Sequence, residues 1–600
     1  LVTPDWIVRY MVQNSLGRLW MLNNPASPLR DEMEYYIEPD AEHEDFIEIS
    51  GPDDISLCDP ACGSGHILVY AFELLAKMYL ERGYREREIP ELVLSRNLHG
   101  MEIDPRAAQI ARLALAMCAR GMDRRFFGRG VQADIAVLSP VALGEGDVPQ
   151  GSALEKKKDL VDALAHLDEV GSLLAPDGAD LAAIREAMEL TGADGLFGSS
   201  SKEKLQRALE TCETLARRHD CVVANPPYMG SSSFGPFMSK WVKKNYPDVK
   251  SDLCTCFIER GFSLAKDRGY EAMITASSWM FISSFEAMRK RIVSDKKICS
   301  LIQQSTHGYA GVTVPTCMFV IESGDTRSKV GSYIRLFDFD RPKLQQPKAL
   351  EAIKNPDCGW FYRRDAETFK QIPGTPIAYW ASDALLDAFA NAKQLNEFGK
   401  PRQGLATGEN ARFVREWWEV DDQKSSYSCC SLEESVSSAY KWFPYNKGGD
   451  FRKWYGNNEC VINWEDDGNS VREYSGSVIR NPDCYFRPSI TWSKISSGSI
   501  AFRFKPAGHV FDVAGTSVFS DAESLKYLQG ACNSSVIMRV ASMLSPTLNF
   551  EVGQIATYPI IQNEELEPSV NSTVDSCREL SKTDWDSFET SWDFKRHPLL

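Results

Sequence analysis

The sequence predicts an α/β fold: a doubly wound, mostly parallel sheet of the Rossmann type with a helical insertion, followed by a β-rich domain. Three observations predict it. Strands, glycine turns and helices alternate from about residue 55 to 138. A charged segment with helical periodicity interrupts this alternation at about 141–219. After about residue 330, glycine, serine and aromatic residues become frequent and the expected strands are short.

Length and composition narrow the possible classes of protein. A chain of 600 residues is too long for a single core. No apolar run approaches the ~18–20 residues needed to cross a membrane. A net charge of −16 argues against indiscriminate nucleic-acid binding but permits a local basic channel. The sixteen cysteines lack the paired spacing of a zinc site, so we expect no metal and mostly buried thiols in a reducing cytosol. The chain starts without Met, and we expect both ends to be cut from a larger protein.

The first segment, residues 1–23, reads as an amphipathic helix. Thr3 is the expected N-cap and Pro4 the first helical residue. The following segment, 25–53, is acidic and loop-like.

A glycine loop follows the first strand in "LCDPACGSGHIL" and opens a helix. Gly63 and Gly65 lack a Cβ, so a ligand can approach the backbone and the unpaired N–H groups of the helix N-terminus. Leu68 stands where the dinucleotide fingerprint has its third glycine. The next acidic strand end follows about forty residues later rather than the ~20 of a nicotinamide site. A tight strand–helix turn without a ligand is the alternative.

Acidic residues follow the next two strands. Glu102 can accept hydrogen bonds from a ribose diol, and Asp104 either joins it or caps the next helix. Asp134, in "VQADI", is expected to end a third strand, where it would accept from an exocyclic amine or cap the next segment. Polar groups at consecutive strand ends line one crevice at the carboxyl edge of the sheet. The pattern favours an adenosine moiety that carries a cationic group.

The strand "CVVA" ends abruptly at "NPPY". Two prolines fix the backbone and leave the carbonyl of Pro226 without a sheet partner, and Asn225 offers a side-chain oxygen beside it. Two rigid acceptors suit an –NH2 donor, and Tyr228 supplies an aromatic face for a planar base. The alternative is a rigid loop with a buried tyrosine.

These motifs carry a family resemblance. "DPACGSG", "GMEID" and "NPPY", in that order, resemble motifs I, II and IV of the amino-group DNA methyltransferases that use S-adenosylmethionine. "TPDWIVRYMV" resembles motif X standing first, and the trailing β-rich segment resembles a target-recognition domain, which is the order of the γ class of mostly N6-adenine enzymes. "KWFPYNKGGDFRKWYGN", "ITWSKISSGSIAFRF" and "SWDFKRHPLL" are similar to the PglX family of BREX phage-defence systems.

The resemblance implies transfer of a methyl group to N6 of a flipped-out adenine in double-stranded DNA, without a metal, for self/non-self marking in a bacterial or archaeal cytosol. It implies other BREX defence proteins as partners and no membrane. The implied catalytic residues are Asn225, Pro226, Pro227 and Tyr228. The implied cofactor residues are Thr3, Pro4, Asp59, Pro60, Ala61, Cys62, Gly63, Ser64, Gly65, Glu102, Ile103, Asp134 and Asn225.

Further residues follow from the resemblance. "SDLCTCFIERG" resembles motif V, with Asp252 and Phe257 as pocket residues, and "YAGVTVPTC" offers Tyr309 as a partner of the flipped base. The expected DNA contacts, besides Tyr228 and Tyr309, are basic and aromatic: Lys243, Lys244, Lys250, Lys447, Arg452, Lys453 and Trp454. A solvated helix face and a surface hairpin with a packed Trp are the alternatives for the two basic groups.

The expected domains are a methyltransferase domain over 1–330, a connector with the last strand over 331–394, a target-recognition domain over 395–560 and a C-terminal connector over 561–600. Four other functions remain open: a type IIG or type I-like modification subunit, a protein or RNA amino methyltransferase, a DNA-binding scaffold subunit that needs partners, and a fused nuclease. No convincing nuclease constellation is visible in these residues. Protein and RNA enzymes are usually shorter and lack the large β-rich domain.

Overall fold

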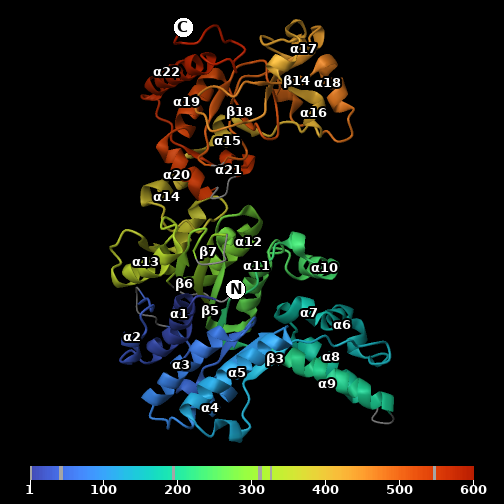
Figure 1. Cartoon of the computed structure of the whole chain (residues 1–600), viewed down its shortest axis with the longest axis vertical. Helices are drawn as coiled ribbons and strands as arrows, with labels where there is room; N and C mark the ends of the chain where they lie inside the picture. The colour runs from blue at the N-terminus through green and yellow to red at the C-terminus, as the bar shows by residue number, and fades with distance from the viewer. Residues whose placement is uncertain are drawn as a thin grey trace. The chain divides into compact units, whose positions relative to one another are not determined.

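The computed structural model describes residues 3–39, 45–191, 196–308, 314–324, 328–496, 498–544 and 549–600. It divides into two compact units, Leu1–Lys370 and Gln371–Leu600, each considered by itself (Figure 1). In the described residues, no helix has the length and hydropathy needed to cross a membrane. Eleven of the sixteen cysteines are buried thiols, as their scattered spacing predicted.

The first unit is built on a nine-stranded sheet in the order β3-β2-β1-β4-β5-β7-β6-β8-β9. Strands β3, β2, β1, β4 and β5 are parallel, and β7 runs antiparallel between β5 and β6. The strands are β1 (Leu57–Asp59), β2 (Leu98–Glu102), β3 (Asp134–Val137), β4 (His219–Ala224), β5 (Ala265–Ala276), β6 (Lys296–Gln303), β7 (Thr316–Ser323), β8 (Val330–Arg335) and β9 (Phe361–Asp365). The predicted doubly wound, mostly parallel sheet is confirmed. Its order reverses between β1 and β4, where ligands of such sheets bind.

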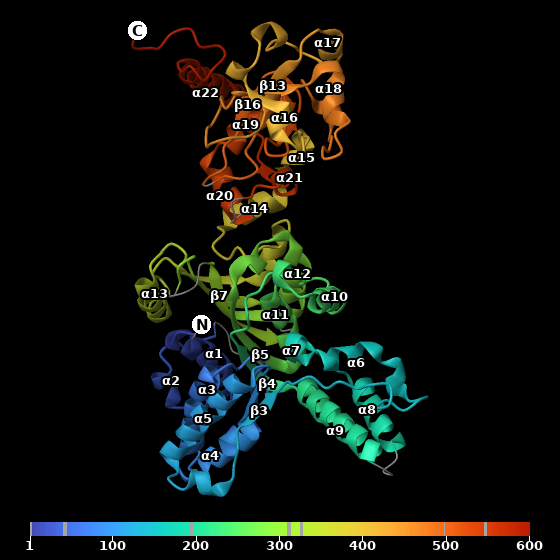
Figure 2. The same ribbon diagram turned by 45° about the vertical axis from the view of Figure 1, so that its right-hand side comes forward.

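Helices cover both faces of this sheet. Figures 1 and 2 show α1, α3 and α5 on one side and α11 and α12 on the other. The helices of the first unit are α1 (Asp5–Asn23), α2 (Leu29–Glu32), α3 (His66–Glu81), α4 (Ile89–Leu92), α5 (Pro105–Met122), α6 (Lys158–Ala165), α7 (Leu167–Val170), α8 (Gly178–Leu190), α9 (Leu196–Ala216), α10 (Pro236–Asn245), α11 (Leu253–Leu264), α12 (Glu286–Asp295) and α13 (Pro342–Lys354).

The insertion between β3 and β4 is helical, as predicted. It contains α6 to α9 together with the 3-10 turns η4 (Ala153–Lys156) and η5 (Gly171–Leu173). In both ribbon views its helices lie across the sheet from α3 and α5 (Figures 1 and 2).

Helix α1 departs from the prediction in two ways. It is buried on nearly every side rather than amphipathic, because it packs between α3 and the strands β5 and β7. Its buried polar residues have partners: Asn14 donates to the carbonyl of Tyr35 at 2.8 Å, and the hydroxyls of Tyr10 and Ser300 lie 2.7 Å apart. Thr3 does not cap the helix, since α1 begins at Asp5 after Pro4 and has no side-chain cap.

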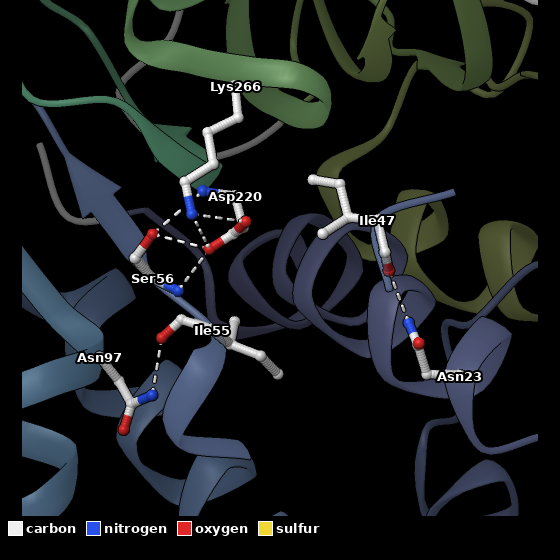
Figure 3. A network of polar contacts seen from close by, with 7 residues as sticks. All are labelled: Asn23, Ile47, Ile55, Ser56, Asn97, Asp220 and Lys266. Carbon is white, nitrogen blue, oxygen red and sulfur yellow. Dashed lines mark hydrogen bonds and ion pairs between the residues drawn. The ribbon is translucent and has the colours of Figure 1, made fainter. Parts of the chain in front are cut away.

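A buried polar network aligns the two strands at the centre of the sheet (Figure 3). Asp220, 1% exposed, accepts from the backbone and side chain of Ser56, both at 2.8 Å, and pairs with Lys266 at 2.9 Å. Charge-assisted bonds of this kind are stronger than neutral ones. Asn97 donates to the carbonyl of Ile55 at 2.7 Å and so fixes the backbone just before β1. The starts of β1 and β4 are therefore held in register across 164 residues of sequence.

The second unit contains the additional short strands that the sequence predicted. Its sheets run β11-β18-β15-β16, β12-β14-β13-β17 and β10-β19. The strands are β10 (Lys393–Gln394), β11 (Lys400–Arg402), β12 (Val414–Glu416), β13 (Trp442–Asn446), β14 (Cys460–Asn463), β15 (Ser489–Thr491), β16 (Arg503–Lys505), β17 (Val510–Phe511), β18 (Ser517–Phe519) and β19 (Pro559–Ile560). Its helices are α14 (Asp383–Asn391), α15 (Leu395–Phe398), α16 (Asn410–Phe413), α17 (Leu432–Ser437), α18 (Glu465–Arg472), α19 (Ala522–Cys532), α20 (Ser535–Leu544), α21 (Val552–Ala556) and α22 (Glu567–Asp586).

The division between the units falls after Lys370, inside the segment 331–394 that was expected to be a connector with the last strand. Strands β8 and β9 add to the edge of the large sheet. The functional labels of the segments 395–560 and 561–600 stay predictions.

Candidate active site

A cavity of about 300 Å³ lies at the carboxyl ends of β1 to β4, beside the reversal in strand order. Its volume is at the lower end of the range for small-molecule sites. It is lined by Pro60, Ala61, Glu102, Ile103, Leu138, Glu169, Val170, Gly171, Ser172, Leu173, Asn225, Pro227, Leu253 and Phe257. The lining thus brings together residues that follow four different strands, as the sequence predicted for the first, second and fourth of them.

The glycine loop after β1 has the conformation that its glycines permit. Gly63 and Gly65 have φ values of +50° and +82°, where residues with a Cβ are strained. A Cβ at Gly65 would lie 2.9 Å from the Cβ of Ala111 on α5. Close packing against this helix therefore requires glycine at 65, while Ser64 between the two glycines is exposed.

Glu102, at the end of β2, braces this loop. Its Oε2 accepts from the N–H of Gly63 at 2.7 Å, and its Oε1 accepts from the N–H groups of Ile103 and Asp104 at 2.9 Å. A carboxylate has about four acceptor positions, so it retains capacity for a ligand hydroxyl. Asp104 caps α5 by accepting from the N–H of Arg106, which is the second of the two roles considered for it.

Asp59 lies beneath the loop and is 1% exposed. Burial raises the pKa of its carboxyl to about 8, and the nearby Glu102 adds to this increase. The hydrogen bond from the N–H of Ala61 lowers the pKa and offsets part of the effect. An uncompensated buried carboxylate is costly, and a cation bound nearby would favour the ionised form. Buried Cys62 completes the inner side of the loop.

The two predicted acceptors stand at the end of β4. The side-chain Nδ2 of Asn225 donates to the hydroxyl of Thr3 at 2.8 Å, which leaves Oδ1 as the acceptor of the amide. Thr3 is 6% exposed and lies 222 residues from Asn225 in the sequence. In the part of the chain that the structure describes, no recorded hydrogen bond reaches the carbonyl of Pro226. Tyr228 is half-buried and donates to the carbonyl of Ile274 at 3.2 Å.

The motif V residues separate into two roles. Phe257, on α11, lines the cavity. Asp252 caps α11 instead, by accepting from the N–H of Cys254 at 2.9 Å.

Asp134 lies elsewhere, and its expected position at the end of a strand is wrong. It begins β3 opposite His99, whereas Glu102 pairs with Val137, so Asp134 lies three residues from the cavity edge. Its carboxylate contacts His99 at 2.7 Å and Arg217 at 3.2 Å, and the hydrogen bond to His99 lowers its pKa. The residues after Asp134 are apolar as far as Leu138, and Pro140 follows shortly after. This pattern indicates that Leu138, and not Asp134, lies at the carboxyl edge of the sheet.

The cavity also includes residues that the sequence did not predict. Glu169 to Leu173, in α7 and η5, come from the insertion and line the cavity. No local pattern marks these residues, because only the tertiary fold brings the insertion to the sheet edge.

The expected DNA contacts occupy varied environments. Lys243 is exposed on α10, and its neighbour Lys244 pairs with Asp159. Lys250 is exposed after α10. Tyr309 lies outside the described residues.

In the second unit, the basic–aromatic cluster is engaged with its own fold. Arg452 pairs with Asp584 and lies over the ring of Trp585, and Lys453 donates to the carbonyl of Asn533 at 3.0 Å. Trp454 lines an apolar cavity, and Lys447 is half-buried. These contacts favour the hairpin with a packed Trp over a DNA surface for Arg452 and Lys453.

Comparison with known proteins identifies related methyltransferases. Residues 96–308 match the family model of the Eco57I restriction-modification methylases. The chain is 36% identical to the adenine-specific methyltransferase BrxX of Escherichia coli O9:H4 (strain HS), with 100% of the chain and 52% of the relative aligned. It is 35% identical to the adenine-specific methyltransferase PglX of Lacticaseibacillus casei (strain Zhang), with 100% and 53% aligned.

Along its whole length, the chain is similar to adenine-specific methyltransferases. The predicted resemblance to PglX is confirmed. The chain spans about half the length of these curated relatives.

Solved structures confirm the fold. A nuclease-deletion mutant of the Type ISP restriction-modification enzyme LlaGI, in complex with a DNA substrate mimic, matches with a TM-score of 0.53 at 12% identity, over 97% of this chain and 47% of that one. The Type IIL restriction-modification enzyme MmeI, in complex with DNA, matches with a TM-score of 0.51 at 14% identity, over 98% and 71%.

Proposed function

We propose that this chain carries the catalytic part of a DNA methyltransferase that modifies adenine at N6. One observation carries the proposal: Asn225 lines a cavity at the strand-order reversal, and its Nδ2 donates to Thr3, which leaves Oδ1 free to accept beside the residue that bears the Pro226 carbonyl. Two fixed acceptors suit the two hydrogens of an exocyclic amine. The similarity to adenine-specific methyltransferases supports adenine as the base.

The cavity fits S-adenosylmethionine, which supplies an electrophilic methyl group when bound. Gly63 and Gly65 leave the backbone open, and the neighbouring acid Asp59 suits the cationic amino group of the methionine end. Glu102 would hold the ribose hydroxyls, and Ile103 and Phe257 provide apolar walls for a planar ring. No metal takes part in this proposal; among the described residues, no group of three or more His, Cys, Asp or Glu side chains could hold one.

The chain's own residues position the amine. Adenine in a duplex must rotate out of the stack to reach a pocket, where Tyr228 would contact its face. Oδ1 of Asn225 and the carbonyl of Pro226 would accept from the N6 hydrogens, which draws the nitrogen lone pair toward the methyl donor. Thr3 holds the amide of Asn225 in the orientation that presents Oδ1. The residues contribute mainly orientation and electrostatic stabilisation.

The biological setting is part of the same proposal. We assign sequence reading of double-stranded DNA to the segment 395–560, and self/non-self marking in BREX phage defence, alongside other defence proteins in the cytosol, to the whole protein. The relatives BrxX and PglX, which match over the full chain, support this assignment.

The test is Asn225→Ala. Losing one of two acceptors should lower the single-turnover methylation rate by at least about 100-fold, as does removal of one preorganised hydrogen-bonding group elsewhere. The affinity for S-adenosylhomocysteine should change less than about threefold, because Glu102 and the glycine loop are intact. Asn245→Ala, at the end of α10, is the matched control. Methylation at near wild-type rate in Asn225→Ala would refute the assignment.

The target base is identified by single-molecule sequencing of DNA from cells with and without the protein, which reports the base and its context. Methyl transfer to RNA or protein, and not to DNA, would instead identify the chain as an RNA or protein amino methyltransferase. Activity only after addition of partner proteins would favour a subunit of a larger modification complex.

A further inference from the structure

The inserted segment that contains α7 and η5 is fixed to the core at four points. The hydroxyl of Ser172 donates to the carbonyl of Pro60 at 2.6 Å, and Nε of the buried Arg260 donates to the carbonyl of Ser172 at 2.6 Å. Tyr246 donates to the carbonyl of Leu173 at 2.6 Å. His166, just before α7, stacks on Phe237 of α10 with ring centroids 3.8 Å apart. This part of the insertion is therefore a fixed wall of the cavity, held in place by hydrogen bonds and ring stacking.

The wall lies against the residues expected to enclose the ring of the cofactor. A Cβ at Gly171 would be 2.9 Å from Cγ2 of Ile103, so the backbone at Gly171 packs directly on that side chain. Ile103, Leu138 and Phe257 give the cavity an apolar interior suited to a planar heterocycle. A purine bound in this space would also need hydrogen-bond partners for its polar edge.

Two carboxylates line the cavity, Glu102 and Glu169. Glu102 already accepts three backbone N–H groups. Glu169 is exposed, and within the described ranges no ion pair or side-chain hydrogen bond is recorded for its carboxylate. Asp134, the acid expected to meet the adenine amine, begins β3 and pairs with His99. Glu169 thus has the free acceptor that the site needs.

We propose that Glu169, from the insertion, accepts a hydrogen bond from the exocyclic amine of the cofactor's adenine, and that α7 with η5 forms that end of the cofactor site. This inference rests on the proposed function, because it assumes that the cavity holds an adenosyl cofactor. The insertion then helps the enzyme to select adenosyl compounds over analogues with other purines.

The experiment compares S-adenosylhomocysteine with its hypoxanthine counterpart, S-inosylhomocysteine, by titration calorimetry on the full chain. The hypoxanthine ring carries an oxygen in place of the amine, so it offers an acceptor to the Glu169 carboxylate. The wild-type protein should prefer the adenine compound by about 10- to 100-fold, as expected for a hydrogen bond to a charged group. Glu169→Ala should bring the preference within about twofold.

Two matched variants complete the design. Asp168→Asn removes the neighbouring carboxylate on α7, and Asp134→Asn removes the acid at the start of β3; both should keep the wild-type preference. A preference that survives in Glu169→Ala, or that is lost in Asp134→Asn, overturns the proposal. A circular dichroism melt shows whether each variant is folded. If Glu169→Ala does not fold, Glu169→Gln replaces it in the comparison. A preference in Glu169→Gln as large as in the wild-type protein would also overturn the proposal. A folded wild-type chain that binds neither compound would refute the proposed cofactor itself, which distinguishes the two failures.

Discussion

Asp59 occupies an environment very different from that of an ordinary surface carboxylate. Burial raises its pKa to about 8, so the folded protein without a ligand favours the neutral acid. The unfolded chain has a carboxyl of ordinary pKa, near 4. Ionisation of Asp59 therefore reduces the free energy of unfolding as the pH rises from about 4 to about 8. The buried position of Asp59, which suits a bound cation, therefore makes the protein without a ligand less stable at neutral pH.

A pH titration tests this reading. A bound cationic amine favours ionised Asp59, so the affinity for S-adenosylhomocysteine should fall by about tenfold for each pH unit below 8. Asp59→Asn should bind weakly, with a flat pH profile, while unfolding at a higher temperature than the wild-type chain at pH 8. Calorimetric titrations from pH 6 to 7.5 measure the first effect and thermal melts the second. A wild-type affinity that is flat over this range would contradict the role of Asp59.

Sequence patterns predicted some site residues and missed others for physical reasons. Glu102 and Asn225 were predictable because Glu102 ends a short strand and Asn225 directly follows another, so the local pattern places both at the carboxyl edge of the sheet. Asp134 was misplaced because the strand was expected to stop there, although its apolar pattern runs to Leu138. The partnership of Thr3 with Asn225 spans 222 residues, and no local pattern contains it.

At the scale of elements, the loop between β1 and α3 depends on two backbone conformations that only glycine adopts without strain. Gly65→Ala meets both a φ of +82° and a Cβ contact of 2.9 Å with Ala111. We expect it to lower the free energy of unfolding by about 1–3 kcal/mol and to weaken cofactor binding. Denaturant unfolding and calorimetry measure the two effects. Gly83→Ala, at a φ of +83° with no atom within 4 Å of the added Cβ, isolates the conformational cost. Equal losses in both variants would show that packing on α5 contributes nothing.

Element types were more predictable than their surroundings. Period and glycine placement identified the alternating strands and helices and the helical insertion. The predicted amphipathic environment of α1 was wrong because β5 and β7, from distant parts of the chain, cover the side that was expected to face solvent. The role of η5 was likewise invisible, since its contacts are made by Pro60, Tyr246 and Arg260.

At the scale of the whole molecule, the overall charge of −16 means that DNA affinity must come from local basic groups. Arg452 already pairs with Asp584, whereas Lys243 is exposed on the helix that follows the proposed catalytic loop. Lys243→Ala should reduce the slope of log K against log salt by about 0.9 if it contacts a phosphate. Arg452→Ala should leave the slope unchanged and lower the melting temperature. Fluorescence anisotropy between 50 and 200 mM salt checks the slopes; the reverse result would restore Arg452 as a DNA contact.

The packing of α1 has a consequence for synthesis. The hydroxyl of Tyr10 meets Ser300, which the ribosome adds 290 residues later. At about 5–20 residues per second, roughly 15–60 s pass between the synthesis of Tyr10 and that of Ser300. During that interval α3 can cover one side of this helix, but the side that packs on β5 and β7 stays uncovered. The nascent chain should therefore be a client of ribosome-associated chaperones until β7 has emerged.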